Sequence, residues 1–298
     1  MNPDPYVVLD ARFRVCFNRT AQAEQLWSGA RWTEGPAYFP AGRYLVFSDI
    51  PNNRLLRFDE CNGSVSVFRQ PANYANGNTV DREGRLVTAE HGRRVTRTEH
   101  DGRIIVIADN YQGKRLNSPN DVVVKSDGSI WFTDPPYGIL SDYEGDKAES
   151  ELGKSYVFRA DPLGGGLTPV ADDFSRPNGL AFAPDEKRLY IADSDRALAH
   201  IRVFDVSEQG KLSGGDVFAV CQSVRFDGFR VDDAGRIWAA TDEGVHCYDP
   251  DGTLIGKVML PEILSNIVFG GIKRNRLFIT ATTSLYAVML LVNGAKTF

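Results

Sequence analysis

The sequence predicts an all-β protein, a six-bladed β-propeller, because one strand-turn-strand pattern recurs six times. Each repeat begins with a polar residue that lies nine or ten positions before an Arg or Ser at the end of a polar turn. The spacings between successive turn-ending residues are 42, 44, 59, 48 and 40 positions. Periods near 40 to 50 residues with about four strands each are typical of propeller blades. The leading polar residues are Glu34, Asn76, Asn120, Asn178, Asp227 and Asn266.

Further strand-forming segments complete the blades. Each of the first five repeats ends in an outer strand, and these strands are SVSVFRQ, RIIVIADN, LTPVADDF, GDVFAVCQ and KVMLPEI. The last repeat stops after SLYAVMLL, whereas the spare strand AEQLWSG precedes Glu34. We therefore predict that this N-terminal strand closes the ring by completing the last blade, with residues 1–20 packed on the outside. The chain is expected to be one domain over residues 1–298, with residues 1–33 as the N-terminal extension and closing strand.

Composition excludes several classes of partner. The 298 residues carry a net charge of −5, which offers no basic surface for nucleic acid. No apolar run approaches the length of about 18 residues that a membrane span needs. The N-terminus lacks a basic start followed by an apolar core, so we expect a cytoplasmic protein, or a periplasmic one if a leader has been removed. The four cysteines lack CxxC spacing and are expected to be free thiols. We expect a monomer or weak homodimer.

The leading residues are predicted to converge on one mouth of the central channel, because the innermost strand of every blade lines that channel. Five of the second strands end in an acid beside the same mouth, which predicts a second acidic ring of Asp49, Glu90, Asp134, Asp193 and Asp242. Asn and Asp before Gly are also common turn formers, so an alternative is that these residues only start and end strands. A narrow mouth with several carboxylates and amides nevertheless needs a cation or water to satisfy them.

The chemistry of four leading residues indicates a metal site. Glu34 and Asp227 supply carboxylates, while Asn120 and Asn178 supply amide oxygens. Such an all-oxygen set suits one hard divalent ion, with Ca²⁺ first and Zn²⁺, Mn²⁺ or Mg²⁺ as alternatives. The four histidines fall outside this register, so a dedicated zinc site of nitrogen and sulfur ligands is not expected. Asn76 and Asn266 are expected to support the ligands or to bind channel water.

At these positions the chain resembles the SMP-30/gluconolactonase/luciferin-regenerating enzyme family. The matching segments span nearly the whole chain: WTEGPAYF, SPNDVVV, FTDPPYG, RPNGLAF and FDGFRVD, with TAEHGRRVTR and YEGDKAESELG similar to the bacterial gluconolactonases. The resemblance implies a six-bladed propeller whose central divalent cation is held by Glu34, Asn120, Asn178 and Asp227. It also implies hydrolysis of a sugar lactone, such as glucono-1,5-lactone, to the aldonic acid. Lactonases, arylesterases and organophosphate hydrolases share this fold and metal site.

The resemblance makes Asp227 the candidate general base as well as a metal ligand. A carboxylate bound to a cation is acidified, so Asp227 could instead only orient the attacking water, and Asp134 or Glu90 is then the candidate base. A serine nucleophile is not indicated, because GxSxG does not occur in the sequence.

Residues around the mouth are expected to select the substrate. His91, Arg93, Asn117 and Tyr137 are the candidates, since a hydroxyl-rich lactone needs donors and acceptors. Alternative roles are strand capping for His91 and an ion pair with a surface acid for Arg93. The insert from residue 135 to 155 is expected to form a mobile loop over the mouth, with a lid as one possible role. The competing functions are a promiscuous arylesterase or phosphotriesterase and a non-enzymatic, Ca²⁺-stabilised ligand-binding propeller.

Overall fold

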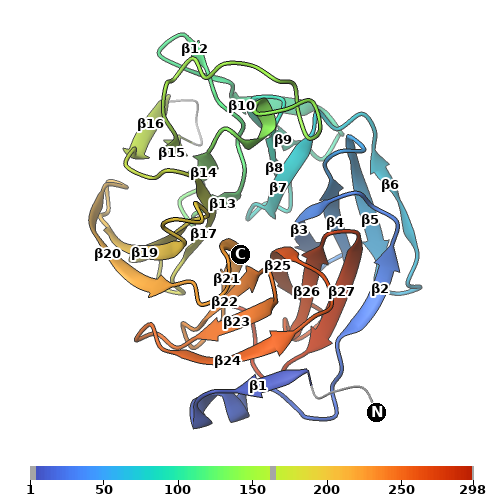
Figure 1. The fold of residues 1–298 in the computed structure, drawn as a ribbon. Helices are drawn as coiled ribbons and strands as arrows, with labels where there is room; N and C mark the ends of the chain where they lie inside the picture. Colours follow the sequence, from blue (N-terminus) through green and yellow to red (C-terminus); the bar gives the residue numbers. More distant parts are fainter. Residues whose placement is uncertain (1–4, 162–165, 297–298) are drawn as a thin grey trace.

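The strands form six antiparallel blades arranged as a ring around a central axis. The computed structural model describes residues 5–161 and 166–296, and Figure 1 views the ring along its axis. In each blade the innermost strand contains or directly follows the leading residue, and in blades one to five the next three strands pair outward in chain order. This arrangement confirms the predicted six-bladed β-propeller.

The blades follow one another along the chain. Blade one contains β3 (Thr33–Phe39), β4 (Tyr44–Asp49), β5 (Arg54–Asp59) and β6 (Val65–Arg69); blade two contains β7 (Ala75–Val80), β8 (Leu86–Glu90), β9 (Arg94–Thr98) and β10 (Ile104–Ala108). Blade three contains β13 (Val122–Val124), β14 (Ile130–Asp134), β15 (Tyr156–Ala160) and β16 (Leu167–Ala171); blade four contains β17 (Pro177–Phe182), β18 (Arg188–Asp193), β19 (His200–Val206) and β20 (Leu212–Val220). Blade five contains β21 (Phe226–Val231), β22 (Ile237–Thr241), β23 (Gly244–Tyr248) and β24 (Leu254–Met259).

Blade six joins the two ends of the chain. Its inner strands are β25 (Leu264–Gly270), β26 (Arg276–Ala281) and β27 (Ser284–Met289), and its outer strand is β2 (Glu24–Ser28). β2 pairs antiparallel with β27, which confirms the predicted closure by the N-terminal strand. The described part of the preceding segment also packs outside the ring, as expected. The sequence did not indicate that β1 (Tyr6–Val8) pairs with β24 and gives blade five a fifth strand.

The remaining elements are short. A two-stranded hairpin of β11 (Asn110–Tyr111) and β12 (Lys114–Arg115) connects blades two and three, and the 3₁₀ helices are η1 (Ala11–Val15) and η2 (Tyr137–Ile139). Neither described helix is long and apolar enough to cross a membrane.

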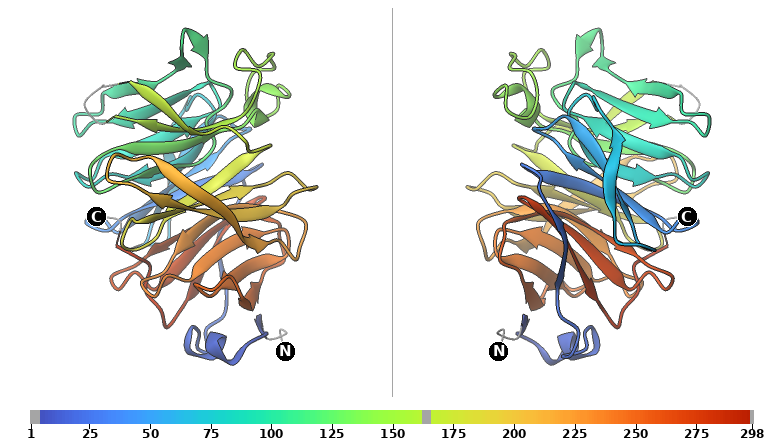
Figure 2. Two further views of the ribbon diagram at one scale, coloured as in Figure 1. Left: turned by 90° about the vertical axis from the view of Figure 1, so that its left-hand side faces the viewer. Right: turned by 90° about the vertical axis from the view of Figure 1, so that its right-hand side faces the viewer.

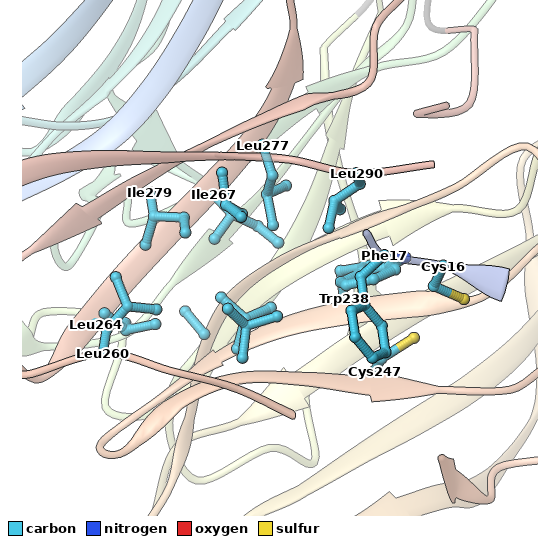
Figure 3. Packing of buried hydrophobic residues seen from close by; sticks show 14 of the residues in the cluster. Cys16, Phe17, Trp238, Cys247, Leu260, Leu264, Ile267, Leu277, Ile279 and Leu290 are labelled. Carbon is cyan, nitrogen blue, oxygen red and sulfur yellow. The ribbon is translucent and has the colours of Figure 1, made fainter. Parts of the chain in front are cut away.

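The buried side chains form six clusters in the described structure, and each cluster lies between two neighbouring blades. The largest joins blades five and six to the N-terminal segment, as Figure 3 shows. There Phe13 of η1 packs against Trp238 of β22, with the ring centroids 6.0 Å apart. The cluster between blades six and one includes Leu26 and Trp27 of the closing strand. The N-terminal segment therefore supplies apolar contacts as well as a strand.

Deletion of residues 1–29 is expected to destabilise the ring. The truncation exposes the edge of β27 and removes Trp27, whose ring lies 5.9 Å from that of Phe47. An unpaired strand edge beside apolar surface promotes aggregation, so we expect aggregation or loss of cooperative unfolding in light scattering and thermal melts. The matched control is Leu9→Ala, because the Leu9 side chain is exposed. A monodisperse truncated protein with an unchanged melting temperature would contradict the proposed role of the closing strand.

Candidate active site

β-Bulges place the leading side chains at the channel mouth. The register of the innermost strands shifts between Glu34 and Ala37, between Pro177 and Leu180, and at the corresponding places in three other blades. In blade three, Asn120 lies just before β13, and its N–H donates to the Thr133 carbonyl at 2.8 Å. A bulge redirects side chains and interrupts pairing, which explains how polar residues at the start of a buried strand face the axis.

Glycines allow the innermost strands to approach one another closely. A Cβ atom on Gly35 would lie 2.1 Å from the backbone oxygen of Asn76, and one on Gly179 would lie 2.5 Å from that of Asp227. Gly35 also has a φ angle of +50°, a conformation that favours glycine. The glycine that follows a leading residue therefore packs against the leading residue of the next blade, and this contact sets the spacing of the site.

The acids that end the second strands fix the loops that lead into the site. Asp134 accepts the N–H groups of Asn117 and Ser118, both at 2.9 Å, and Asp193 accepts those of Ser175 and Arg176. Asp49 and Asp242 accept N–H groups at the corresponding places in blades one and five. Asp49, Glu90, Asp134 and Asp193 are buried. The sequence analysis expected a second acidic ring open to the mouth. The structure does not show one, because the oxygens of these acids accept hydrogen bonds from the protein itself.

Glu90 has the same structural role through its side-chain contacts. Its Oε2 accepts hydrogen bonds from Asn73 at 2.6 Å and from Arg94 at 2.5 Å, while its Oε1 accepts one from Thr96. Burial raises the pKa of Asp134 to about 7, a value that would suit a general base. Both oxygens of Asp134 are nevertheless engaged by backbone donors. Glu90 and Asp134 lie outside the wall of the mouth pocket, so the structure does not place either beside a bound substrate.

Substitution of Asp134 is therefore expected to affect folding more than chemistry. In Asp134→Asn the amide keeps one acceptor oxygen and presents its NH₂ group to a backbone N–H, which leaves a buried donor unsatisfied. Such a loss costs about 1–3 kcal/mol, so the melting temperature should fall while kcat of the folded fraction stays within about threefold. Chemical denaturation and kinetics normalised to folded protein measure both effects. A loss of kcat by about 10² at unchanged stability would restore Asp134 as a candidate base.

The pocket at the mouth contains all four predicted metal ligands. Eleven described residues form its wall: Trp32, Glu34, Ile50, Asn76, His91, Asn120, Tyr137, Glu144, Asn178, Arg225 and Asp227. They come from blades one to five and from the loop that contains η2. The structure therefore brings Glu34, Asn120, Asn178 and Asp227 together, as the shared register predicted.

Glu34 and Asp227, the two carboxylates among the predicted metal ligands, are buried, and their like charges oppose ionisation of both. Burial raises the pKa of Asp227 to about 7, although Arg225 and a hydrogen bond from Asn178 act in the opposite direction. Burial also raises the pKa of Glu34 well above its usual range, and the charge of Asp227 adds to this effect. A cation between them would offset both effects, because it favours the ionised carboxylates.

The hydrogen bonds of the site leave one carboxylate oxygen free to bind such a cation. Oδ1 of Asp227 is buried, and no described residue donates a hydrogen bond to it. Asn266 donates to Oε2 of Glu34 at 3.3 Å and thereby supports this carboxylate, as expected from its place in the repeat. Within residues 5–161 and 166–296 no group of three or more His, Cys, Asp or Glu side chains could hold a metal ion. The residues that fit one are instead two carboxylates and two amides, the donor set that oxygen-seeking divalent ions prefer.

His91 lies in the pocket wall, but both of its ring nitrogens are engaged by the protein. Nδ1 lies 2.9 Å from the Glu144 carbonyl oxygen, so it must carry the proton, and Nε2 therefore accepts from the amide of Asn76 at 2.8 Å. Burial lowers the pKa of His91, which favours this neutral form. The Asn76 amide is thereby oriented with Oδ1 buried and free of donors among the described residues. His91 thus positions Asn76, whose oxygen is available to a ligand.

Arg93 and Asn117 lie outside the pocket wall and anchor the loop of residues 135–155. Arg93 donates to the Leu116 carbonyl at 2.6 Å and pairs with Glu151 at 3.3 Å. Asn117 donates to the Asp134 and Lys154 carbonyls, each at 3.0 Å. The structure therefore does not bring these two candidates to the substrate position. The ion pair is the alternative role that the sequence analysis considered for Arg93.

The 135–155 loop forms one side of the pocket. Tyr137 and Glu144 line the wall, while Glu151 accepts the Arg115 N–H at 2.9 Å and holds the loop against the preceding hairpin. Burial raises the pKa of Tyr137 to about 12, so its phenol remains a hydrogen-bond donor near neutral pH. Of the four predicted substrate-binding residues, His91 and Tyr137 line the pocket, whereas Arg93 and Asn117 do not.

Four wall residues were not named as candidates from the sequence: Ile50, Glu144, Trp32 and Arg225. The last two contact one another. The Arg225 guanidinium lies over the Trp32 ring, 6.0 Å from its centroid. The charge of Asp227 raises the pKa of Arg225. Nε of Arg225 is buried and makes no hydrogen bond to a described residue, although it lies 3.8 Å from a carboxylate oxygen of Asp242. Trp32 and Arg225 each lie two positions before a leading residue, Glu34 and Asp227, and this shared spacing is the signal that could have identified them.

A family model matches most of the chain. The SMP-30/gluconolactonase/LRE-like region matches residues 32–283 of this chain. The chain belongs to the SMP-30/gluconolactonase/LRE-like family. The matched region includes every residue of the mouth pocket.

Individual relatives in the SMP-30/gluconolactonase/LRE-like family cover most of the chain. A gluconolactonase of Zymomonas mobilis is 34% identical over 295 residues, covering 89% of this chain and 80% of that protein. A pentonolactonase of Haloferax volcanii is 30% identical over 262 residues, covering 85% and 82%. The solved structure of a gluconolactonase from Xanthomonas campestris has a TM-score of 0.92 and 39% identity, covering 97% of this chain and 96% of that one.

Proposed function

We propose that this protein hydrolyses a sugar lactone of the glucono-1,5-lactone type to the aldonic acid, with one divalent cation held by Glu34, Asn120, Asn178 and Asp227. The observation that carries the proposal is the convergence of these four side chains in one buried pocket. Relatives that act on gluconolactone and pentonolactone favour a sugar lactone over other esters. Ca²⁺ is the first candidate for the cation, and Zn²⁺, Mn²⁺ and Mg²⁺ are the alternatives.

The cation would supply Lewis-acid stabilisation of the oxyanion that forms at the lactone carbonyl. Glu34, Asn120 and Asn178 hold their oxygens in place for this purpose. Asn120 is positioned by its own N–H bond to Thr133, and the Asn178 carbonyl accepts the Thr133 hydroxyl at 2.9 Å. Because Thr133 of blade three bonds both its own blade and blade four, the ring itself presets the site.

Asp227 is the proposed general base, because its Oδ1 is the buried carboxylate oxygen in the pocket without a donor. The oxygen of a water molecule forms a bond to the lactone carbonyl carbon as Asp227 accepts one of its protons. The bond between that carbon and the ring oxygen then breaks. The ring oxygen takes the proton back and becomes a hydroxyl of the open-chain aldonic acid, which restores the carboxylate.

Other wall residues are proposed to orient the sugar. Asn76 Oδ1 can accept a hydrogen bond from a sugar hydroxyl, and the Tyr137 phenol and Arg225 guanidinium can donate to ring or hydroxyl oxygens. Trp32 and Ile50 add apolar surface to the same pocket. A site that hydrogen-bonds substrate hydroxyls discriminates strongly against analogues that lack them.

A substrate panel tests the proposed function. Proton release by purified protein in Ca²⁺ buffer, corrected for spontaneous hydrolysis, should give a higher kcat/KM for glucono-1,5-lactone than for its analogue δ-valerolactone, which lacks the hydroxyls. The ratio should be about 10² or more. Phenyl acetate and a phosphotriester serve as probes of the competing hydrolase functions. A higher kcat/KM for either of them would contradict a sugar lactonase, and turnover of none of the substrates would favour a binding protein.

A further inference from the structure

The central channel contains a second cavity, at the end opposite the mouth pocket. It has a volume of about 110 Å³ and is lined by residues from all six blades. Its apolar wall includes Ala37, Val80, Val124, Phe182, Val231 and Phe269, which lie several residues beyond the leading positions on their strands. An engineered apolar cavity of about 150 Å³ takes up benzene. The space therefore suits the body of a small ring or a short aliphatic chain.

An ion pair links the wall of this cavity to the segment that carries the ligand candidate Asn120. Arg230 of β21 reaches Asp121 at 3.3 Å, and Asp121 immediately follows the leading residue Asn120. Both side chains are largely buried, with 13% and 1% of their areas exposed. In both views of Figure 2 the end of the described chain lies on the face opposite the yellow-green loop near residues 140–150. Ala295 and Lys296 at this end line the cavity.

The polar groups of the cavity favour an anion. Nη1 of Arg274 is buried, and the described chain offers it no acceptor. Lys296 adds a second cation, while Arg230 already pairs with Asp121. The acid in the wall, Glu186, is compensated by Arg82 at 3.3 Å and Lys125 at 3.5 Å. A ligand carboxylate would satisfy the Arg274 donor, and charge-assisted bonds of this kind are strong.

We propose that this opposite mouth is a second ligand site for a small carboxylate with a compact apolar body about the size of a benzene ring. The apolar body fills the space enclosed by the six innermost strands, and the carboxylate faces Arg274 and Lys296. This site is separate from lactone hydrolysis, because none of the residues that line it lines the mouth pocket.

Titration with benzoate tests the proposal on the full-length protein. Calorimetry and ligand-observed NMR should show saturable binding at one site per chain, with Kd of about 1 mM or tighter. Benzylamine has a similar body and the opposite charge, so it should not bind. Gluconate, whose body is polar, should not displace benzoate. Absence of saturable benzoate binding, or equal binding of benzylamine, would overturn the proposal.

Two variants locate the site. Arg274→Met keeps much of the aliphatic stem and removes the donor, so it should weaken benzoate binding about tenfold. Val124→Phe fills the cavity from another blade and should abolish binding. It also keeps the test informative if the first variant folds poorly. Glu34→Gln, in the other pocket, is the matched control and should bind benzoate as the wild type does. Loss of binding in Glu34→Gln alone would instead place benzoate in the mouth pocket and contradict a second site.

Discussion

Protein freed of divalent cations by a chelator is expected to lose its lactone hydrolysis by about 10²-fold or more. The physical reason is that the cation would stabilise the oxyanion at the lactone carbonyl. Without it, burial raises the pKa of both Glu34 and Asp227, so the empty pocket does not hold both groups as carboxylates. Addition of Ca²⁺, Mn²⁺ or Zn²⁺ should restore the rate. Initial rates on glucono-1,5-lactone, measured beside elemental analysis of the same samples, check this expectation.

The control for chelation is the fold itself. Circular dichroism and thermal melts of the stripped protein should show that the propeller remains folded while activity is lost, since six interblade clusters hold the described structure together. If stripped protein verified to be metal-free hydrolyses lactone at the full rate, the proposed role of the cation is wrong. If stripping unfolds the protein, the cation would have the structural role of the competing binding-protein function.

Asp227→Asn is expected to lower kcat by about 10² or more at saturating metal. The amide keeps an oxygen that can face the cation, so metal binding should weaken only modestly, whereas the loss of the proton acceptor cannot be restored by added metal. The measurement is kcat at saturating metal, with occupancy determined directly by elemental analysis. Asn178→Ala is the matched control, because it removes a proposed ligand without removing a base, and excess metal should largely restore its rate.

Near-complete rescue of Asp227→Asn by metal would remove Asp227 as the base. The remaining carboxylates in the pocket wall are Glu34 and Glu144, and they would become the candidates. The earlier alternatives, Asp134 and Glu90, are less suitable. Their oxygens already accept hydrogen bonds from backbone and side-chain donors, and both residues lie outside the pocket wall. The structure thus changes which substitutions would follow that result.

The repeat in the sequence predicted the ring, its closure and the convergence of the leading residues. This was possible because strand alternation and turn residues are local properties, and a fixed offset within each blade becomes a fixed position around the axis. The same register identified Glu34, Asn120, Asn178 and Asp227 as one set, which the structure brings into a single pocket. The proposed metal and its role remain predictions.

Other features depend on contacts between segments far apart in the chain. The sequence could not show that His91 bonds Asn76 and the Glu144 carbonyl, because Glu144 lies in the long insert. For the same reason Arg93 and Asn117 resembled binding residues although they anchor that insert. The pairing of β1 with blade five was missed because a three-residue strand carries little pattern of its own.

The number of divalent cations bound per chain tests the central claim most directly. Equilibrium dialysis of stripped protein against Ca²⁺, Mn²⁺ and Zn²⁺ separately should give one site per chain for at least one of these ions. That site should be lost in the double variant Glu34→Ala/Asp227→Ala and retained in Asp134→Asn, whose carboxylate lies outside the pocket wall. The account predicts that lactone hydrolysis rises in proportion to occupancy of this one site. Unchanged stoichiometry and affinity in the double variant would contradict it, since the cation would then bind elsewhere.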